Sequence, residues 1–195
     1  MEAHLSQICS TVSDSLYRIG RIRKFLDRTH TERLVHAFIT TRLDYGNSML
    51  YGLSDSLTKR LRNLQNSAAR LVTRTRLNEH ITPILRDLYW LPVYQRTQFK
   101  ILVITFKIVH GQAPLHLSSL LTRWSPRKST RQAAEIRFIE PEFRRDYCSE
   151  YYGGRSFSVA APRLWNKLPN SIRTKPTIES FKSALKTRLF RQHFY

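Results

Sequence analysis

No set of acidic side chains in this 195-residue sequence has the spacing that two-metal phosphoryl transfer requires. Such a site needs converging carboxylates, usually from paired or closely spaced aspartates, and neither Asp-Asp nor Asp-x-Asp occurs here. Glu140 and Glu142 flank Pro141, a setting that favours a loop over a pair of ligands. The sequence therefore predicts no metal site and no catalytic carboxylate.

The cysteines and histidines are also badly spaced for chemistry. Zinc takes about four Cys or His ligands in close sets, and His4 with Cys9 does not supply them. Cys9 falls in an apolar stripe, as core cysteines do, and no local arrangement activates Cys148 as a nucleophile. Because the phosphate-binding glycine motifs are missing as well, we expect no cofactor and no enzyme activity from this chain alone.

Cations are what the sequence supplies in quantity. It contains 33 Lys and Arg against 14 Asp and Glu, a net charge of +19. Self-repulsion between like charges costs stability, and the usual reason to tolerate it is a polyanionic partner such as nucleic acid. The alternative is a solvated basic surface without a ligand.

Two expected helices arrange these cations in rows, at about 100° per residue. The helix from Leu5 to Leu26 has one row opposite its apolar stripe, and the helix that starts at Ser54-Asp55 has another, which also includes Thr73. The core face of this second helix is predicted to contain Leu57, Leu61, Leu64, Ala68, Leu71 and Val72. We call the two rows the first and second basic ladders. Neither contains an acid, whereas an ordinary amphipathic helix mixes both signs on its polar face. A phosphate backbone would follow such a row, and a tyrosine would stack on a base. The candidate nucleic-acid-binding residues are Tyr17, Arg21, Lys24 and Arg28 in the first ladder, and Lys59, Arg62, Asn66, Arg70 and Arg74 in the second.

Apolar periodicity predicts further helices around the ladders. Thr29 and Glu32 have the spacing of a capping box before a helix that buries Leu34, Val35, Phe38, Ile39 and Leu43. A short helix begins at Thr82-Pro83, and a longer one over 93–110 is apolar nearly all round, so it belongs at the centre of the fold. Another short helix covers 114–121, and the chain closes with a helix over 177–190 that buries Ile178, Phe181, Leu185 and Leu189.

The character of the sequence changes after residue 121. Residues 122–134 are basic, polar and aperiodic, which is typical of a linker. Residues 135–140 and 157–161 each alternate apolar and polar side chains, so we expect them to pair as a small β-hairpin. The predicted fold is mainly α: a helical bundle over 1–121, a basic linker, and a small α+β region over 135–195.

The sequence also predicts a compartment. It has no basic leader with an apolar block, no apolar stretch of about 20 residues, and two cysteines only. We expect a nuclear or cytoplasmic protein that is not secreted and has no membrane partner.

Five strings carry a resemblance that goes beyond composition. They are residues 34–53 (LVHAFITTRLDYGNSMLYGL), 61–75 (LRNLQNSAARLVTRT), 80–117, 154–173 (GRSFSVAAPRLWNKLPNSIR) and 180–190 (SFKSALKTRLF). In this order they closely resemble the C-terminal part of the reverse transcriptase of non-LTR, LINE-type retrotransposons, in particular jockey-like and related elements. The resemblance covers nearly the whole chain.

This resemblance implies a helical thumb, which in that family packs on the RNA/DNA template–primer duplex. The two helices with basic ladders are the thumb candidates, and the part after Thr122 would help to hold element RNA or target DNA. The family's palm carries an aromatic-Ala-Asp-Asp motif that is absent here, so no catalytic residue is transferred, and polymerase activity would need palm and fingers in trans. Trp90 and Trp165 would belong to the surface that faces a palm.

The sequence departs from the family pattern in places. Gly46 stands where a cysteine is common, Ser54 stands where proline is frequent, and the Cys/His knuckle of some relatives is missing. The start at Met1, directly before the thumb, suggests a truncated element copy. Two alternatives stay open: a freestanding or domesticated basic protein that binds nucleic acid or a protein partner, and a non-functional relic reading frame.

Overall fold

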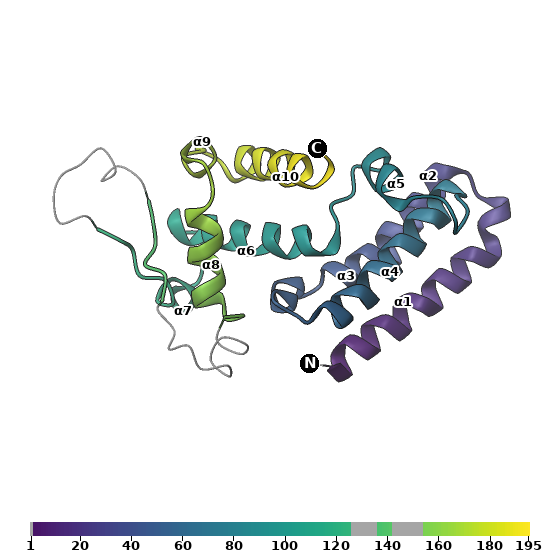
Figure 1. Cartoon of the computed structure of the whole chain (residues 1–195), viewed down its shortest axis with the longest axis horizontal. Coiled ribbons are helices and arrows are strands. Elements are labelled where there is room, and N and C mark those ends of the chain that lie inside the picture. The colour runs from purple at the N-terminus through teal and green to yellow at the C-terminus, as the bar shows by residue number, and fades with distance from the viewer. Residues whose placement is uncertain (1, 126–135, 142–153) are drawn as a thin grey trace. The chain divides into compact units, whose positions relative to one another are not determined.

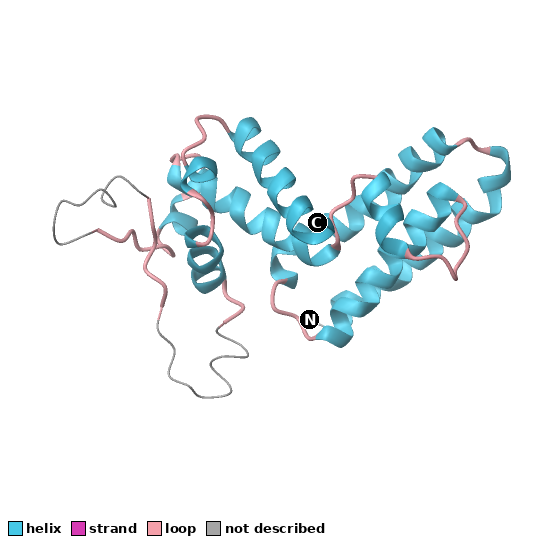
Figure 2. Cartoon of the chain, turned by 45° about the horizontal axis from the view of Figure 1, so that its top comes forward, coloured by secondary structure: helices cyan, strands magenta, loops and turns pink. Residues whose placement is uncertain are grey.

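Helices dominate the computed structural model, which describes residues 2–125, 136–141 and 154–195 (Figure 1). The described ranges contain no β-strand, only one isolated antiparallel bridge between Arg123 and Phe138 (Figure 2). The prediction of a mainly α fold is confirmed.

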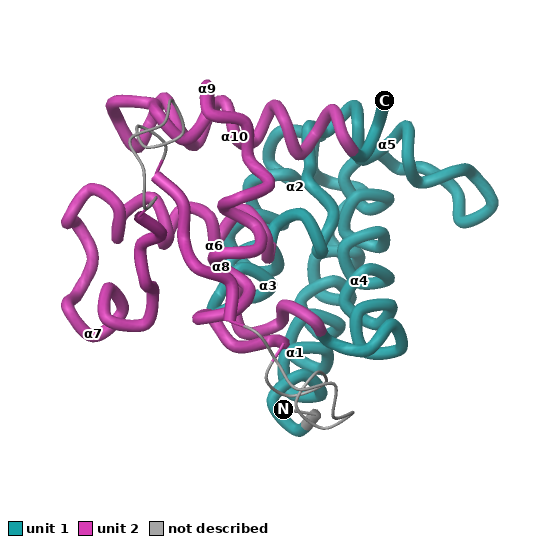
Figure 3. The backbone as a smooth tube through the Cα atoms, turned by 60° about the vertical axis from the view of Figure 1, so that its left-hand side comes forward, with its two compact units in different colours: residues 1–47, 53–96, 193–195 teal, residues 48–52, 97–192 magenta. Residues whose placement is uncertain are grey.

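The chain divides into two compact units (Figure 3). Unit 1 comprises residues 1–47, 53–96 and 193–195, and unit 2 comprises residues 48–52 and 97–192. The division falls inside a helix, α6 (Val93–Val109), whereas the sequence placed a boundary at the start of a linker over 122–134. Residues 126–134 of that linker lie outside the described residues.

Unit 1 is built on two long helices, α1 (Glu2–Ile22) and α4 (Asp55–Thr73), which pack side by side (Figure 1). Leu5, Val12 and Ile19 are buried along α1 at seven-residue spacing, which keeps them on one face of the helix. The apolar stripe of the first helix is thereby confirmed in its centre. The helix ends at Ile22, which stays 46% exposed, so the predicted extension to Leu26 is wrong. Of the first basic ladder, only Tyr17 and Arg21 lie on this helix, while Lys24 lies in a 3-10 turn and Arg28 begins the next helix.

A second helical segment follows a short 3-10 turn, η1 (Arg23–Phe25). Its cap is Asp27 and not the predicted Thr29, because α2 (Arg28–Val35) already contains Thr29. The Asp27 carboxylate accepts a hydrogen bond from the His30 backbone N–H at 2.7 Å, and the Thr31 hydroxyl donates to the Asp27 carbonyl at 2.6 Å. The first bond satisfies one of the free backbone N–H groups of the first turn, and the second satisfies the Thr31 hydroxyl.

One wide turn separates α2 from α3 (Thr41–Asp44): the π-helical segment η2 (His36–Thr40). Val35, Ile39 and Leu43 are buried as predicted, but Phe38 is 54% exposed, so its predicted core position is wrong. A π turn holds more residues than an α turn, and the residues within it leave the helical phase on which the prediction was based.

The buried face of α4 is turned relative to the predicted one. Leu61, Ala68 and Val72 are buried as expected, but Gln65 and Ala69 are buried with them, while Leu57 and Leu64 are only half-buried. The reason is a second neighbour, α5 (Ile81–Asp87), which packs on α4. After α5 the chain returns past Gln65, whose Nε2 donates to the Leu91 carbonyl at 2.7 Å while its Oε1 accepts from the Val93 N–H at 3.1 Å.

Unit 2 has an aromatic core. The residues of α6 from 97 onward lie in this unit, and Phe106 stacks on Phe181 of α10 (Ile178–Phe194), with ring centroids 4.4 Å apart. Phe181 lies 6.0 Å from Trp165, which is fully buried and donates from Nε1 to the Ile136 carbonyl at 2.9 Å. The predicted helices over 93–110 and 177–190 are confirmed, and the remaining short elements are η3 (Asn47–Leu50), α7 (Leu115–Ser118) and α9 (Asn170–Arg173).

The predicted β-hairpin is wrong. Residues 157–161 lie in helix α8 (Phe157–Asn166), because Val159, Ala160, Ala161 and Trp165 form a buried helical face in place of an alternating strand. Residues 136–140, from the other expected strand, form backbone hydrogen bonds with residues 122–124 instead. The Trp124 N–H donates to the Arg137 carbonyl at 3.0 Å, and the Ile139 N–H donates to the Thr122 carbonyl at 2.9 Å. Trp90 and Trp165 are both buried, so the expectation that they face a palm is wrong as well.

Candidate nucleic-acid interface

All nine predicted binding residues lie in unit 1. Seven of them are exposed. Arg28 and Arg74 are two of these and are described further below; the other five are Tyr17, Arg21, Lys24, Lys59 and Arg62. None of the four cations among these five forms an ion pair with an acid in the described part of the chain. Lys24 lies over the Phe25 ring with its Nζ 4.8 Å from the centroid. These side chains are free to reach a phosphate without breaking a salt bridge.

Arg28 differs from the rest of the first ladder because it meets an acid from another helix. Its Nη2 lies 2.7 Å from Oδ2 of Asp87, with both side chains more than half exposed. Helical phasing along one element cannot find such a pair, since the partner is 59 residues away. An exposed pair of this kind contributes about 0–1 kcal/mol, so a stronger anion would displace Asp87.

Two of the predicted binding residues in the second ladder, Asn66 and Arg70, are only partly open to solvent. Arg70 donates to the carbonyls of Arg76 and Glu79, the latter at 2.7 Å, and so holds the loop after α4. Asn66 is half-buried, and its Oδ1 is buried without a hydrogen-bond donor among described residues. The second ladder is therefore open to solvent at Lys59, Arg62 and Arg74.

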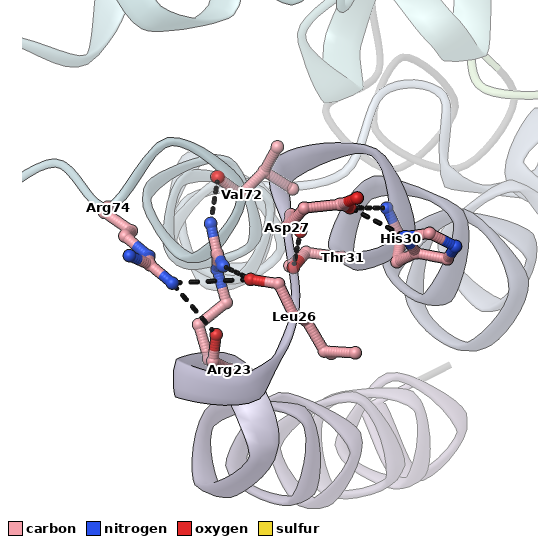
Figure 4. Close-up of polar contacts among 7 residues, drawn as sticks. All are labelled: Arg23, Leu26, Asp27, His30, Thr31, Val72 and Arg74. Carbon is pink, nitrogen blue, oxygen red and sulfur yellow. Dashed lines mark hydrogen bonds and ion pairs between the residues drawn. The ribbon is translucent and has the colours of Figure 1, made fainter.

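A cluster that the ladders only partly include forms where η1 meets the C-terminus of α4 (Figure 4). Arg23 is buried, and its guanidinium donates to Leu71 O at 2.8 Å, Val72 O at 2.9 Å and Leu26 O at 2.7 Å. It thereby supplies donors to carbonyls that the end of a helix leaves unpaired. Burial, and secondly the charge of Arg74, lower the pKa of Arg23.

Arg74 ends α4 in the left-handed conformation, with φ of 58°. Its Nη2 lies 3.2 Å from Arg23 O and 3.3 Å from Leu26 O. Glycine is the usual residue at this position, and a side chain there costs about 1 kcal/mol. The sequence predicted Arg74 as part of the second ladder but gave no role to Arg23. The one sequence signal for Arg23 is the pair of adjacent cations, Arg23 and Lys24, near the predicted end of a helix.

A cavity of about 270 Å³ opens beside this cluster. It is lined by Arg23, Leu26, Asp27, Arg28, Val72, Thr73 and Arg74. Three of these side chains are cations. The acid Asp27 is engaged elsewhere: its Oδ1 lies 2.8 Å from Nδ1 of His30 and caps α2, and the His30 backbone N–H, then the His30 ring, lower the pKa of this carboxyl.

The C-terminal residues of unit 1 lie near the second ladder. His193 Nδ1 lies 3.3 Å from Nε2 of Gln95, and Arg86 lies over the Tyr195 ring at 6.0 Å. Partial burial, and secondly the charge of Arg62, lower the pKa of His193. Arg62 therefore has a histidine for a neighbour that stays neutral near pH 7.

Unit 2 carries exposed cations that sequence analysis did not single out as binding residues. Its described range has exposed Lys and Arg on α6, α8's C-terminal end and α10: Lys100, Lys107, Lys167, Lys182, Lys186 and Arg191. They do not form one row. On α10, Lys182 and Lys186 lie on one flank of the buried stripe and Arg191 on the other.

Within the described ranges, no three His, Cys, Asp or Glu side chains come together as metal ligands would. In that same part of the chain, no helix is both long and apolar enough to cross a membrane. Comparison with family models, curated proteins and solved structures finds no match to this chain.

Proposed function

We propose that this chain binds the sugar-phosphate backbone of an RNA/DNA duplex, as the helical part that follows the palm in a LINE-type reverse transcriptase. The observation that carries the proposal is the set of exposed cations Arg21, Lys24, Lys59 and Arg62, which meet no acid among described residues on a chain of net charge +19. Tyr17, 69% exposed, adds an aromatic face for a base or sugar.

Binding of this kind is independent of base sequence. Lys and Arg contacts to phosphates position a protein on a duplex and carry no sequence information. Each neutralised phosphate releases counterions, so affinity falls with salt at about 0.9 log units per contact and per log unit of salt. Four contacts give a slope of about −4, and the resemblance to a polymerase thumb fits this mode, because a thumb must hold any template.

The test is a titration of the chain against a short RNA/DNA hybrid at several salt concentrations. The variant Lys59→Glu/Arg62→Glu should bind at least ten times more weakly, and its salt slope should be less steep by about 2. Both side chains are exposed and neither forms an ion pair with a described acid, so the variant should fold normally.

A matched control makes the same change of charge in unit 2. Lys107→Glu/Lys167→Glu also reverses two exposed cations, and it should leave the slope nearly unchanged. An unchanged affinity in the unit 1 variant would refute the proposal. Equal losses in both variants would show that net charge, and not the ladders, attracts the duplex.

A protein partner is the second candidate, because unit 1 also has an apolar cavity. This cavity of about 410 Å³ between α1 and the α2–η2 segment is lined in part by Ile19, Ile22, Leu34 and Phe38. Under the resemblance, the natural occupant is a palm domain supplied in trans. Association that persists at high salt and weakens in Phe38→Ser would favour this function over backbone binding.

A further inference from the structure

We propose that the cavity beside Arg23 and Arg74 is a binding site for a phosphate group. As an anchor for one backbone phosphate the site rests on the proposed function, whereas as a site for an oxyanion it stands on its own geometry. The ligand chemistry is the same in both cases: a small anion whose oxygens accept from arginine.

Two guanidinium groups converge at this point. The one acid of the lining, Asp27, uses its carboxylate to cap α2 and to contact the His30 ring. Arg23 Nη1 and Arg74 Nη2 donate to the same oxygen, the carbonyl of Leu26, at 2.7 and 3.3 Å (Figure 4). The remaining cation of the lining, Arg28, reaches the cavity from the start of α2. Like charges this close repel one another, and an anion in the cavity would relieve the repulsion.

The site has donors to spare. Arginine offers five N–H donors in a planar fork. The hydrogen bonds of Arg74 to described residues all leave from Nη2, and Figure 4 shows its other nitrogens pointing away from those carbonyls. The N–H groups of Nε and Nη1 thus remain as donors. Because these two nitrogens do not share an edge of the guanidinium, each would donate singly to an oxygen of the anion.

The backbone at Arg74 supports a role beyond helix capping. A left-handed residue after a helix is most stable as glycine, and Arg23 already supplies donors to Leu71 and Val72. Arg74 adds only two long hydrogen bonds, to the carbonyls of Arg23 and Leu26. These bonds offset little of the free energy that its left-handed backbone costs. Strain of this kind is typical of functional positions.

The decisive variant is Arg74→Gly, because it removes the guanidinium while relieving the strained backbone. Without phosphate, its thermal midpoint should equal or exceed that of the wild type. Added inorganic phosphate should raise the midpoint of the wild type above a chloride baseline of equal ionic strength, and this rise should be lost in Arg74→Gly. Arg74→Asn, which also tolerates the left-handed conformation, guards against an effect of glycine itself.

Arg60→Gln is the matched control, since Arg60 is an exposed cation of α4 that does not line the cavity. It should keep the full response to phosphate. A wild type without any response, or a response that survives in both Arg74 variants, would overturn the proposal.

Hybrid binding separates the two sources of phosphate. If Arg74→Gly also lowers the hybrid affinity and makes the salt slope less steep by about 1, the site holds a backbone phosphate. If the phosphate response is lost and hybrid binding is unchanged, the site takes free phosphate. Failure of the proposed function would appear separately, as unchanged hybrid binding in Lys59→Glu/Arg62→Glu.

Discussion

The two units handle their positive charge differently. Unit 2 contains 18 of the 33 Lys and Arg residues with six of the 14 acids, and unit 1 contains 15 with eight. Yet the four ion pairs between described residues all lie in unit 1, including the bidentate pair of Arg96 with Asp44 at 2.9 and 3.0 Å. Of the six acids in unit 2, only Glu140 and Glu179 are among the described residues. The comparison therefore concerns the cations that both units show: unit 1 pairs Arg28 and Arg96 with acids, and the exposed cations on the helices of unit 2 lie on several faces.

The comparison teaches that backbone carbonyls, and not only acids, decide which cations are free. In unit 1, Arg23 and Arg70 donate to carbonyls at the end of α4 or in the loop after it, and Arg74 donates to the carbonyls of Arg23 and Leu26. In unit 2, Arg123 donates to the Val109 carbonyl at 3.1 Å in the same way. A count of charges therefore overestimates the surface that remains for a ligand.

The largest expected effect concerns the cores. Trp165→Ala in unit 2 should lower the free energy of unfolding by about 3–5 kcal/mol, because it empties the centre of the aromatic cluster and removes the bond to Ile136. Ile39→Val in the aliphatic core of unit 1 should cost about 0.5–1.5 kcal/mol. Urea denaturation followed by circular dichroism measures both, and similar costs would mean that the aromatic cluster is not the main support of unit 2.

Next comes the buried arginine of unit 1. Arg23→Met keeps the length of the side chain but removes three hydrogen bonds to carbonyls, so it should destabilise the protein by about 2–3 kcal/mol. The neighbouring exposed change Lys24→Met should stay within about 0.5 kcal/mol. Equal stabilities for the two variants would contradict the structural role of Arg23.

A smaller effect, a gain in affinity for nucleic acid, is expected from a change at Asp87. Asp87→Asn releases Arg28 from its exposed ion pair, at a cost below about 1 kcal/mol in stability. The freed cation should raise the affinity for an RNA/DNA hybrid by roughly threefold and steepen the salt slope by about 1. A weaker complex would place Arg28 outside the interface.

The smallest effect is the pH response of His193. Its folded pKa is lowered by partial burial and by Arg62, so the unfolded chain binds the proton more tightly and stability rises with pH. This contribution is complete above the ordinary histidine value of about 6.5 and is lost as the pH falls through the lowered pKa. Arg62→Gln should raise the pKa of His193 in an NMR titration, and a fixed value would show that Arg62 does not act on it.

Long periodic elements could be predicted from the sequence, and their surroundings could not. The helices α6 and α10 follow from unbroken apolar periodicity, and Gly111, with φ of 67°, comes two residues after α6 ends. The buried face of α4 was predicted from its leucines, but α5 and Gln65 turned it. The strand predicted over residues 157–161 is wrong because three alternating apolar residues fit the start of a helix as well as a strand. The helical face becomes evident only when Trp165 is included.

For the candidate site, every residue named from the sequence lies in unit 1, and the structure shows contacts that the sequence does not reveal. Arg21, Lys59 and Arg62 are exposed on the helices from which they were predicted, whereas Lys24 is exposed in the 3-10 turn that follows α1. Arg28 and Arg70 were assigned by position along one helix, whereas their partners lie elsewhere in the chain. Arg23 escaped notice because its burial depends on carbonyls 48 and 49 residues away.

The π-helical turn at His36–Thr40 is a place where we expect the fold to accept the deletion of one residue. A π turn closes its hydrogen bonds over one residue more than an α turn, so deleting Ala37 would leave an ordinary helix that still carries Ile39 and Leu43 toward the core. The same deletion within α4 would rotate every following side chain by about 100° and expose Val72. An in-frame deletion of three bases at this turn is therefore expected to leave the fold intact.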